Sequence, residues 1–406
     1  MDNSNNNENK KDEDNGMLAI NKKRIFESLS AKVVRCSKRT INATSEVFEA
    51  ILTKDKSKIV QLSEKGLPDD LQMLRALVWK INLGYLSINY EQWETYLTEK
   101  RRTYQYYKKR FTDLLKNEIE QKNYKSKKLL EDITKDVNRT HLGFAFFFQP
   151  ISKEKHFTSE ELHQLFKKRQ NCSIKDINDI YRLNIEETHA DVLARMLFIY
   201  SKFTPDISYH QGMNEILAPI YYCYSYDKLY TEETEDTVEA DTFWSFYLLM
   251  ENIRSSFDNS DKKGTEFKNN ILKQILTIVD KEIYDKLESN DVKFEFFVYR
   301  WFISFFSQNF DMGDVLKLCD LIFSHENKFY YVFYFSIAIL IYKRDEILKN
   351  DLSGIMMAIQ NLEDIRVDQL INFVILLRKE FDSQIRPLID LTNRNEKEIL
   401  LSVKQS

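Results

Sequence analysis

The stretch that decides the fold class is residues 294–306, which reads FEFFVYRWFISFF. Large apolar side chains recur in it at three- and four-residue steps, at positions 294, 297, 298, 301, 302, 305 and 306. That spacing places them along one stripe of an α-helix, because 3.6 residues make one turn. An aromatic stripe of this kind is typical of a helix that packs into a core, more than of a cofactor site.

Further segments with the same helical period occur along most of the chain. They are residues 71–85, 192–200, 315–322 and 370–377. In the first of them, Asp69 or Asp70 is placed to cap the helix N-terminus just after Pro68. The chain has only 8 glycines and 5 prolines, too few for the turns of a sandwich or barrel. We therefore expect an all-α protein of long helices joined by polar loops.

Composition narrows the class of function. Of the 406 residues 43% are hydrophobic, enough to bury a sizeable core. The 59 basic and 63 acidic residues give a net charge of -4. The sequence has no strongly basic domain of the kind that binds nucleic acid, which argues against nucleic acid as the main ligand. The mixed charges are typical of solvated helix faces. The four cysteines, at positions 36, 172, 223 and 319, form no CxxC motif, so we expect free thiols in a reducing compartment.

Polar and apolar runs predict how the chain is organised. Residues 1–22 are almost wholly polar, which predicts a disordered tail and not a signal peptide. Three polar stretches, at 152–184, 227–241 and 255–264, predict exposed loops. The most apolar run is residues 329–342, FYYVFYFSIAILIY. Because it is too short to cross a bilayer, it predicts a buried core helix, and we expect no transmembrane segment.

Residue spacing excludes several kinds of active site. The two closest glycines are 18 positions apart, whereas phosphate-binding loops need glycines a few residues apart so that backbone N–H groups can close on the phosphates. The six histidines form no HExxH motif, and none lies near a cysteine at metal-ligand spacing. No serine occupies a GxSxG motif. We expect no cofactor or metal that belongs to the chain itself.

Two short segments concentrate polar groups. Residues 133–139 read ITKDVNR, with Asp136 three positions before Arg139. Residues 209–215 read YHQGMNE, with Gln211 beside a lone glycine. From residue types alone, Arg139 is a helix-end arginine paired with Asp136, and Gln211 is a turn residue next to a permissive backbone position.

The spacing of these two segments resembles the IxxDxxR and YxQ signatures of TBC-domain Rab GTPase-activating proteins, in the order that the family has them. Residues 66–79, GLPDDLQMLRALVW, resemble the opening motif of that domain, and residues 294–320 resemble its C-terminal lobe. Residues 198–222 and 239–254 are especially similar to the group of TBC-domain family member 13. The resemblance covers roughly residues 60–380, most of the chain.

This resemblance implies a two-lobed, all-α TBC domain over residues 66–382, after a helical extension over 23–65 and before a C-terminal tail over 383–406. It also implies a Rab-family GTPase in its GTP-bound state as the partner, which carries the GTP and the magnesium ion. Arg139 would enter the partner's active site as an arginine finger. Gln211 would orient the attacking water in trans.

Other matched positions receive lesser roles from the same resemblance. Asp136 would hold the arginine or its loop, and Tyr209 would position the glutamine turn. Gly212 and Asn214 extend the YxQ signature to YxQGMN. Arg75 and Trp79, in the opening motif, would be structural. Cys319 departs from the pattern, since the family usually has tryptophan there, and this puts the local packing in question.

Two alternatives to a GTPase activator remain open at this point. One is a catalytically silent TBC-like scaffold that binds a GTPase without accelerating it. The other is a helical interaction protein of another kind in which the motifs occur by chance. No lipidation motif is present, so we expect a cytoplasmic protein, peripheral on endomembranes, whose contact with the membrane is indirect.

Overall fold

The structure is a computed structural model, and it describes residues 37–120, 125–140, 144–151, 187–226, 234–254, 257 and 262–405. The predicted tail at 1–22, the predicted loop at 152–184, Cys36 and Cys172 lie outside these residues. Within them every regular element is a helix, and backbone pairing of the β type is limited to an isolated bridge between Pro150 and Thr188. The all-α prediction is therefore confirmed.

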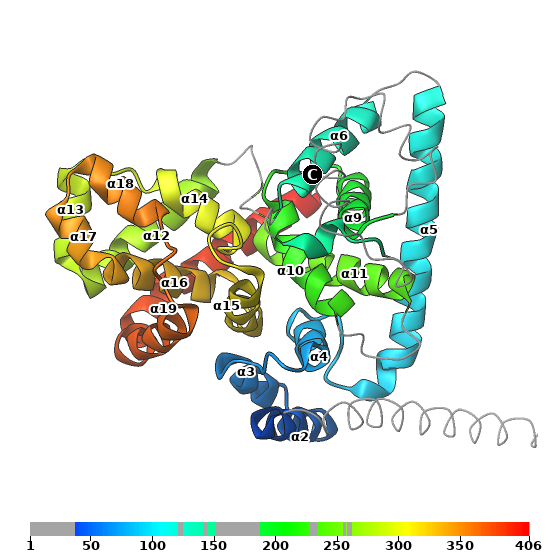
Figure 1. Ribbon diagram of the computed structural model, residues 1–406, viewed down its shortest axis with the longest axis horizontal. Helices are drawn as coiled ribbons and strands as arrows, with labels where there is room; N and C mark the ends of the chain where they lie inside the picture. Colours follow the sequence, from blue (N-terminus) through cyan, green and yellow to red (C-terminus); the bar gives the residue numbers. More distant parts are fainter. Residues whose placement is uncertain are drawn as a thin grey trace, which may run out of the picture.

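Two lobes of helices make up the molecule (Figure 1). In the first lobe α10 is central, and it packs against α4, α9 and α11. The helices of this lobe are α4 (Gln72–Asn82), α5 (Trp93–Glu120), α6 (Lys125–Asn138), α9 (His189–Phe203), α10 (Met213–Tyr226) and α11 (Glu235–Ile253), with the 3₁₀ turns η1 (Tyr90–Gln92) and η2 (Ala145–Phe148). α6 packs against α9 on one side and turns its other side to solvent.

The second lobe is built around α16, which packs against α12, α14, α15 and α19. Its helices are α12 (Lys262–Val279), α13 (Lys281–Ser289), α14 (Glu295–Ser304), α15 (Met312–Ser324), α16 (Phe329–Tyr342), α17 (Arg344–Lys349), α18 (Leu352–Gln360) and α19 (Val367–Gln405). Every side chain of α16 from Phe329 to Leu340 is buried, which confirms the core helix predicted for this run. No helix in the described ranges combines the length and apolar character that crossing a membrane requires.

Two short helices precede the lobes, α2 (Lys38–Leu52) and α3 (Lys56–Glu64). α15 packs against α3 and α4 on one side and against α16 on the other. α10 reaches across to contact α14 and α15. The lobes are thus joined through helix packing.

The predicted cap of α4 is wrong. α4 begins after Leu71, and no side chain caps its first turn. Asp69 instead accepts a hydrogen bond from the guanidinium of Arg75 at 2.8 Å, and Asp70 accepts one from the backbone N–H of Ser37 at 2.9 Å, at the start of α2. The guanidinium of Arg75 and the backbone N–H at the start of α2 are the donors that these carboxylates use, in place of the N–H groups of the first turn of α4.

The acidic stretch predicted as a loop over residues 227–241 is helical from Glu235, where α11 begins. Glu239 and Asp241 are buried there, at 2% and 0% exposure. Asp241 accepts hydrogen bonds from Lys80 at 2.7 Å and from Arg101 at 2.7 Å. Both partners lie far away in the sequence, so the local run of acids could not reveal them. The loop predicted at 255–264 likewise ends early, because α12 starts at Lys262.

The structure places no break at the predicted end of the domain near residue 382. α19 continues through that position, and Ile385 and Ile389 are buried in the core. Asn327 donates to the carbonyl oxygen of Ile389 at 3.2 Å and to the hydroxyl of Thr392 at 3.0 Å. Residues 383–392 therefore pack as part of the second lobe rather than as a tail.

Candidate functional site

Arg139 lies at the end of α6, where the helix gives way to a turn. Its backbone N–H donates to the carbonyl oxygen of Asp136 at 3.2 Å, and its guanidinium forms an ion pair with the Asp136 carboxylate. The Arg139 side chain remains 53% exposed, while that of Asp136 is 11% exposed. The carboxylate therefore anchors one edge of a guanidinium that still faces solvent.

Gln211 lies in the turn between α9 and α10, and it is exposed. The turn uses left-handed backbone at Ser208, with φ of 59°, and at Gly212, with φ of 106°. A Cβ atom at Gly212 would meet the Ile303 side chain at 3.0 Å. Glycine is required there both by its backbone angle and by the close approach of α14. The contact holds the Gln211 turn against the second lobe.

Asn214, in the first turn of α10, joins the two polar segments. Its side-chain oxygen accepts from the backbone N–H of Gly212 at 3.1 Å, and its amide donates to the hydroxyl of Thr140 at 2.7 Å. It thereby ties the glutamine turn to the residue that follows Arg139. Asn214 is 3% exposed, so these hydrogen bonds are shielded from water.

Tyr209 supplies the second tie between the segments. Its hydroxyl donates to the Asp136 carboxylate at 2.7 Å. Burial first, and the adjacent Asp136 second, raise the pKa of Tyr209 well above its usual range, so the phenol stays protonated as a donor. Asp136 thus holds both the Arg139 guanidinium and the Gln211 turn.

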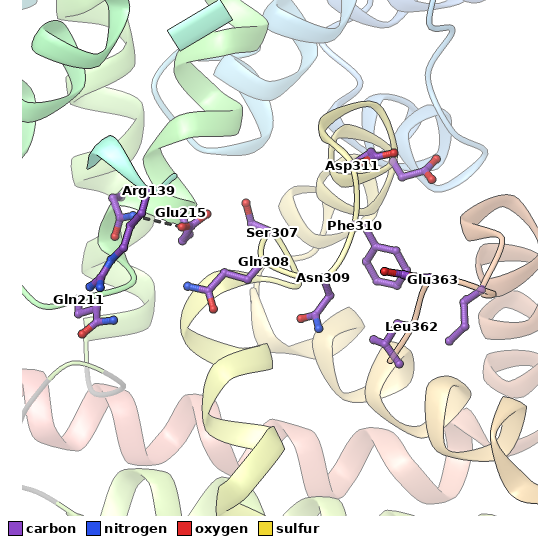
Figure 2. A pocket seen from close by; sticks show the side chains of 13 residues that line it. Arg139, Gln211, Glu215, Ser307, Gln308, Asn309, Phe310, Asp311, Leu362 and Glu363 are labelled. Atoms are coloured by element: carbon purple, nitrogen blue, oxygen red, sulfur yellow. Dashed lines mark hydrogen bonds between the residues drawn. The ribbon is translucent and has the colours of Figure 1, made fainter. Parts of the chain in front are cut away.

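The two segments open onto one pocket of about 630 Å³ between the lobes (Figure 2). Figure 2 shows Arg139, Gln211 and Glu215 at one end of it and Leu362 and Glu363 at the other, with the turn that carries Ser307, Gln308 and Asn309 between them. The remaining lining residues are Asn214, Phe310, Asp311, Asp314, Leu362, Glu363 and Ile365. The predicted pair therefore faces an open, mainly polar pocket.

Glu215 is the last residue of the second polar segment, and its residue type alone predicted no role for it. It is 5% exposed, and burial raises its pKa to about 7, although hydrogen bonds with Gln308 and Ser307 act to lower it. Its Oε1 accepts from the Asn214 amide at 3.2 Å. Glu215 therefore connects the first lobe to the opposite wall, close to Arg139.

Sequence reasoning missed the wall formed by Ser307, Gln308 and Asn309. These residues follow Phe305 and Phe306, both in the left-handed region with φ of 49° and 63°. In the sequence, these residues are marked only as three polar positions between aromatic residues. Such a polar triplet is also typical of an ordinary loop, so it did not indicate a site. Two consecutive bulky residues in this conformation are strained, and such strain is frequent beside functional sites.

Arg75 and Trp79 lie outside this pocket. Both are fully buried, and both donate to Asp320 of α15, from Arg75 Nε at 3.0 Å and from Trp79 Nε1 at 2.8 Å. These bonds join the first lobe to the second. Cys319 is a buried free thiol next to Asp320, so a small apolar side chain fills the space at this position.

The described residues hold no group of three or more histidine, cysteine or acidic side chains that could bind a metal ion. Residues 150–348 of the chain match the family model of the Rab-GTPase-TBC domain. Over these residues the chain is similar to a Rab-GTPase-TBC domain. The matched segment includes the Gln211 turn, whereas Arg139 lies before its first residue.

The chain is also similar to proteins whose names carry the TBC domain or a GTPase-activating function, and to a solved Rab-GAP domain. The chain is 29% identical over 359 residues to human TBC1 domain family member 13, covering 75% of this chain and 89% of the relative. It is 24% identical over 332 residues to the GTPase-activating protein GYP1 of Saccharomyces cerevisiae, covering 77% of this chain and 43% of that protein. The crystal structure of the Ypt/Rab-GAP domain of Gyp1p has the same fold, with a TM-score of 0.60 at 20% identity, and the match covers 85% of this chain and 99% of that one.

Proposed function

We propose that this protein activates GTP hydrolysis by a Rab-family GTPase, and that it adds Arg139 and Gln211 to the active site of its GTP-bound partner. The observation that carries the proposal is that an exposed guanidinium and an exposed carboxamide share the wall of one open pocket. The similarity to proteins named as a GTPase-activating protein and a Rab-GAP domain supports the class of activity.

The chemistry assigned to Arg139 follows from where charge develops in phosphoryl transfer. Negative charge grows on the phosphoryl and leaving oxygens, so a cation placed there stabilises the transition state more than the ground state. The planar guanidinium can donate to two oxygens at once, which an ammonium cannot do with the same geometry. The Asp136 ion pair holds the group near this position until phosphate oxygens compete for its free edge.

The chemistry assigned to Gln211 is the orientation of the attacking water. A carboxamide can accept a hydrogen bond from water and donate one to a phosphate oxygen at the same time. The nucleotide and the magnesium ion belong to the partner, in agreement with the lack of clustered glycines in this chain. Such an activator would act in the cytoplasm on membranes that carry its GTPase, and would thereby regulate vesicle trafficking.

Single-turnover GTP hydrolysis on a responsive Rab tests the role of Arg139. An arginine finger contributes about 10³ to 10⁵ in rate, so we expect Arg139→Ala to lose nearly all stimulation and Arg139→Lys to recover only a small part. Arg102→Ala is the matched control, because Arg102 is an exposed arginine of α5 outside the pocket. A rate for Arg139→Ala close to wild type would exclude the assignment.

Gln211 is tested on a Rab whose own glutamine has been replaced. Gln211→Ala should abolish stimulation there, whereas Gln92→Ala, at an exposed glutamine outside the pocket, should not. Retained stimulation would show that the water is oriented by another group. If the wild-type chain binds GTP-loaded Rab but never accelerates hydrolysis, the silent-scaffold alternative is correct instead.

A further inference from the structure

The solvent side of α6 carries a ridge of side chains at i, i+3, i+7, i+10 and i+14, which all fall on one face of a helix. The residues of this ridge are Lys125, Lys128, Asp132, Lys135 and Arg139. All five are exposed, whereas most of the residues between them are buried or half-buried towards α9 and α5. We call this row the α6 ridge. It combines four basic side chains with one acidic side chain and ends at the arginine of the candidate site.

The positive charge of the ridge contrasts with its surroundings. The whole chain has a net charge of -4, and the opposite wall of the pocket carries Asp311, Asp314 and Glu363. Asp132 is paired with Lys135 at 3.5 Å, but these side chains are 54% and 73% exposed, so water screens the pair and the ammonium remains available to a partner. The ridge is therefore basic within a chain of net negative charge, and it reaches the pocket through Arg139 on the first-lobe side.

We infer that the α6 ridge is a docking surface for an acidic patch beside the nucleotide site of the partner GTPase. This inference rests on the proposed function, since the partner's nucleotide must reach Arg139. Lys135 lies about one turn from Arg139, and Lys128 about 16 Å from it along the axis, at 1.5 Å per residue. A surface that extends over this distance from the nucleotide would meet both lysines.

The position of Arg139 on the same ridge favours a protein partner over an anionic membrane. A flat bilayer against Lys128 and Lys135 would also cover Arg139, and would keep it from a GTPase active site. A protein that receives Arg139 can contact the lysines at the same time. Charges at the edge of an interface mainly steer association, so the ridge should act on binding more than on the chemical step.

The test is the double variant Lys128→Glu/Lys135→Glu in the full chain. Its matched control is Lys281→Glu/Lys349→Glu, which makes the same change in net charge at exposed lysines of α13 and α17 that do not line the pocket. We expect the ridge variant to raise KM for GTP-loaded Rab about tenfold near 0.05 M salt, and to keep kcat within about twofold. The increase should shrink at about 0.5 M salt, and the control should resemble wild type.

Several outcomes would overturn the inference. They are a KM equal to that of the control variant, a loss confined to kcat, or a ridge variant that loses binding only to phosphatidylserine vesicles. Equilibrium affinity for Rab loaded with a non-hydrolysable GTP analogue is measured in parallel. This affinity does not depend on catalysis, so it tests the ridge even if Arg139→Ala shows that the proposed activity is wrong.

Discussion

Arg75 and Arg139 each pair with an aspartate, yet their surroundings differ in almost every respect. Arg75 is fully buried, and its guanidinium donates to Asp320, to Gln72 at 2.7 Å, to Asp69 and to the carbonyl oxygen of Leu67. Arg139 is about half exposed, and its guanidinium bonds only Asp136 among the described residues.

The difference in burial and hydrogen bonding shows which of the two arginines can act on another molecule. Each of the three nitrogens of the Arg75 guanidinium donates inside the protein, and the bonds to Asp320 hold α4 to α15. Arg139 keeps N–H groups that no described residue accepts, at the mouth of a polar pocket. A guanidinium whose nitrogens all donate within the protein stabilises the fold, whereas one with unused N–H donors can bind phosphate oxygens of a partner.

The largest effect on stability should come from Arg75. Arg75→Ala leaves the buried Asp320 carboxylate without its cation, and we expect it to lower the free energy of unfolding by about 3–5 kcal/mol. Arg139→Ala should change the same quantity by less than about 0.5 kcal/mol. Urea denaturation of both variants measures the two values. Equal losses would remove the contrast between a structural and a reactive arginine.

The next effect concerns Glu215, a buried carboxyl group within the site itself. Because the pKa of Glu215 is raised from 4.5 to about 7, the folded protein holds a proton that the unfolded chain releases between these values. The stability due to this proton is complete below about pH 4.5 and is lost as the pH rises, by about 3 kcal/mol at pH 7.

Denaturation of Glu215→Gln at several pH values measures that contribution. We expect the difference between this variant and wild type to grow in favour of the variant from about pH 5 to about pH 7, because glutamine carries no charge to ionise. Glu363→Gln is the control, since Glu363 lines the same pocket but is exposed. Parallel curves for Glu215→Gln and wild type would show that Glu215 is ionised throughout.

The smallest effect should come from Tyr209, and it sharpens the comparison at Asp136. Tyr209→Phe removes the hydroxyl that donates to Asp136 and leaves the ring in place. We expect the rate of stimulated hydrolysis to fall about tenfold, since a hydrogen bond to a charged group contributes about 1.5–3 kcal/mol and only part of it orients the site. Tyr106→Phe, at a side chain 60% exposed, is the control. An unchanged rate would mean that Asp136 positions Arg139 without help from the glutamine turn.

The sequence by itself determined the helices and singled out the residues of the pair. Helical period is a local property, so the stripes at 294–306 and 329–342 predicted α14 and α16 closely. The spacings around Arg139 and Gln211 pointed to two segments that the structure brings onto one pocket. These features depend on residues within a few turns of one another.

Only the tertiary structure decided which charges are buried and what surrounds the pair. Asp241 lies in an acidic run that reads as a loop, but it is buried against lysine and arginine side chains more than a hundred residues away. Glu215 and the Ser307–Asn309 wall meet only because α10 packs against α14. Hydrogen bonds and ion pairs between distant segments depend on how helices pack, and a single sequence carries no local pattern that reveals this packing.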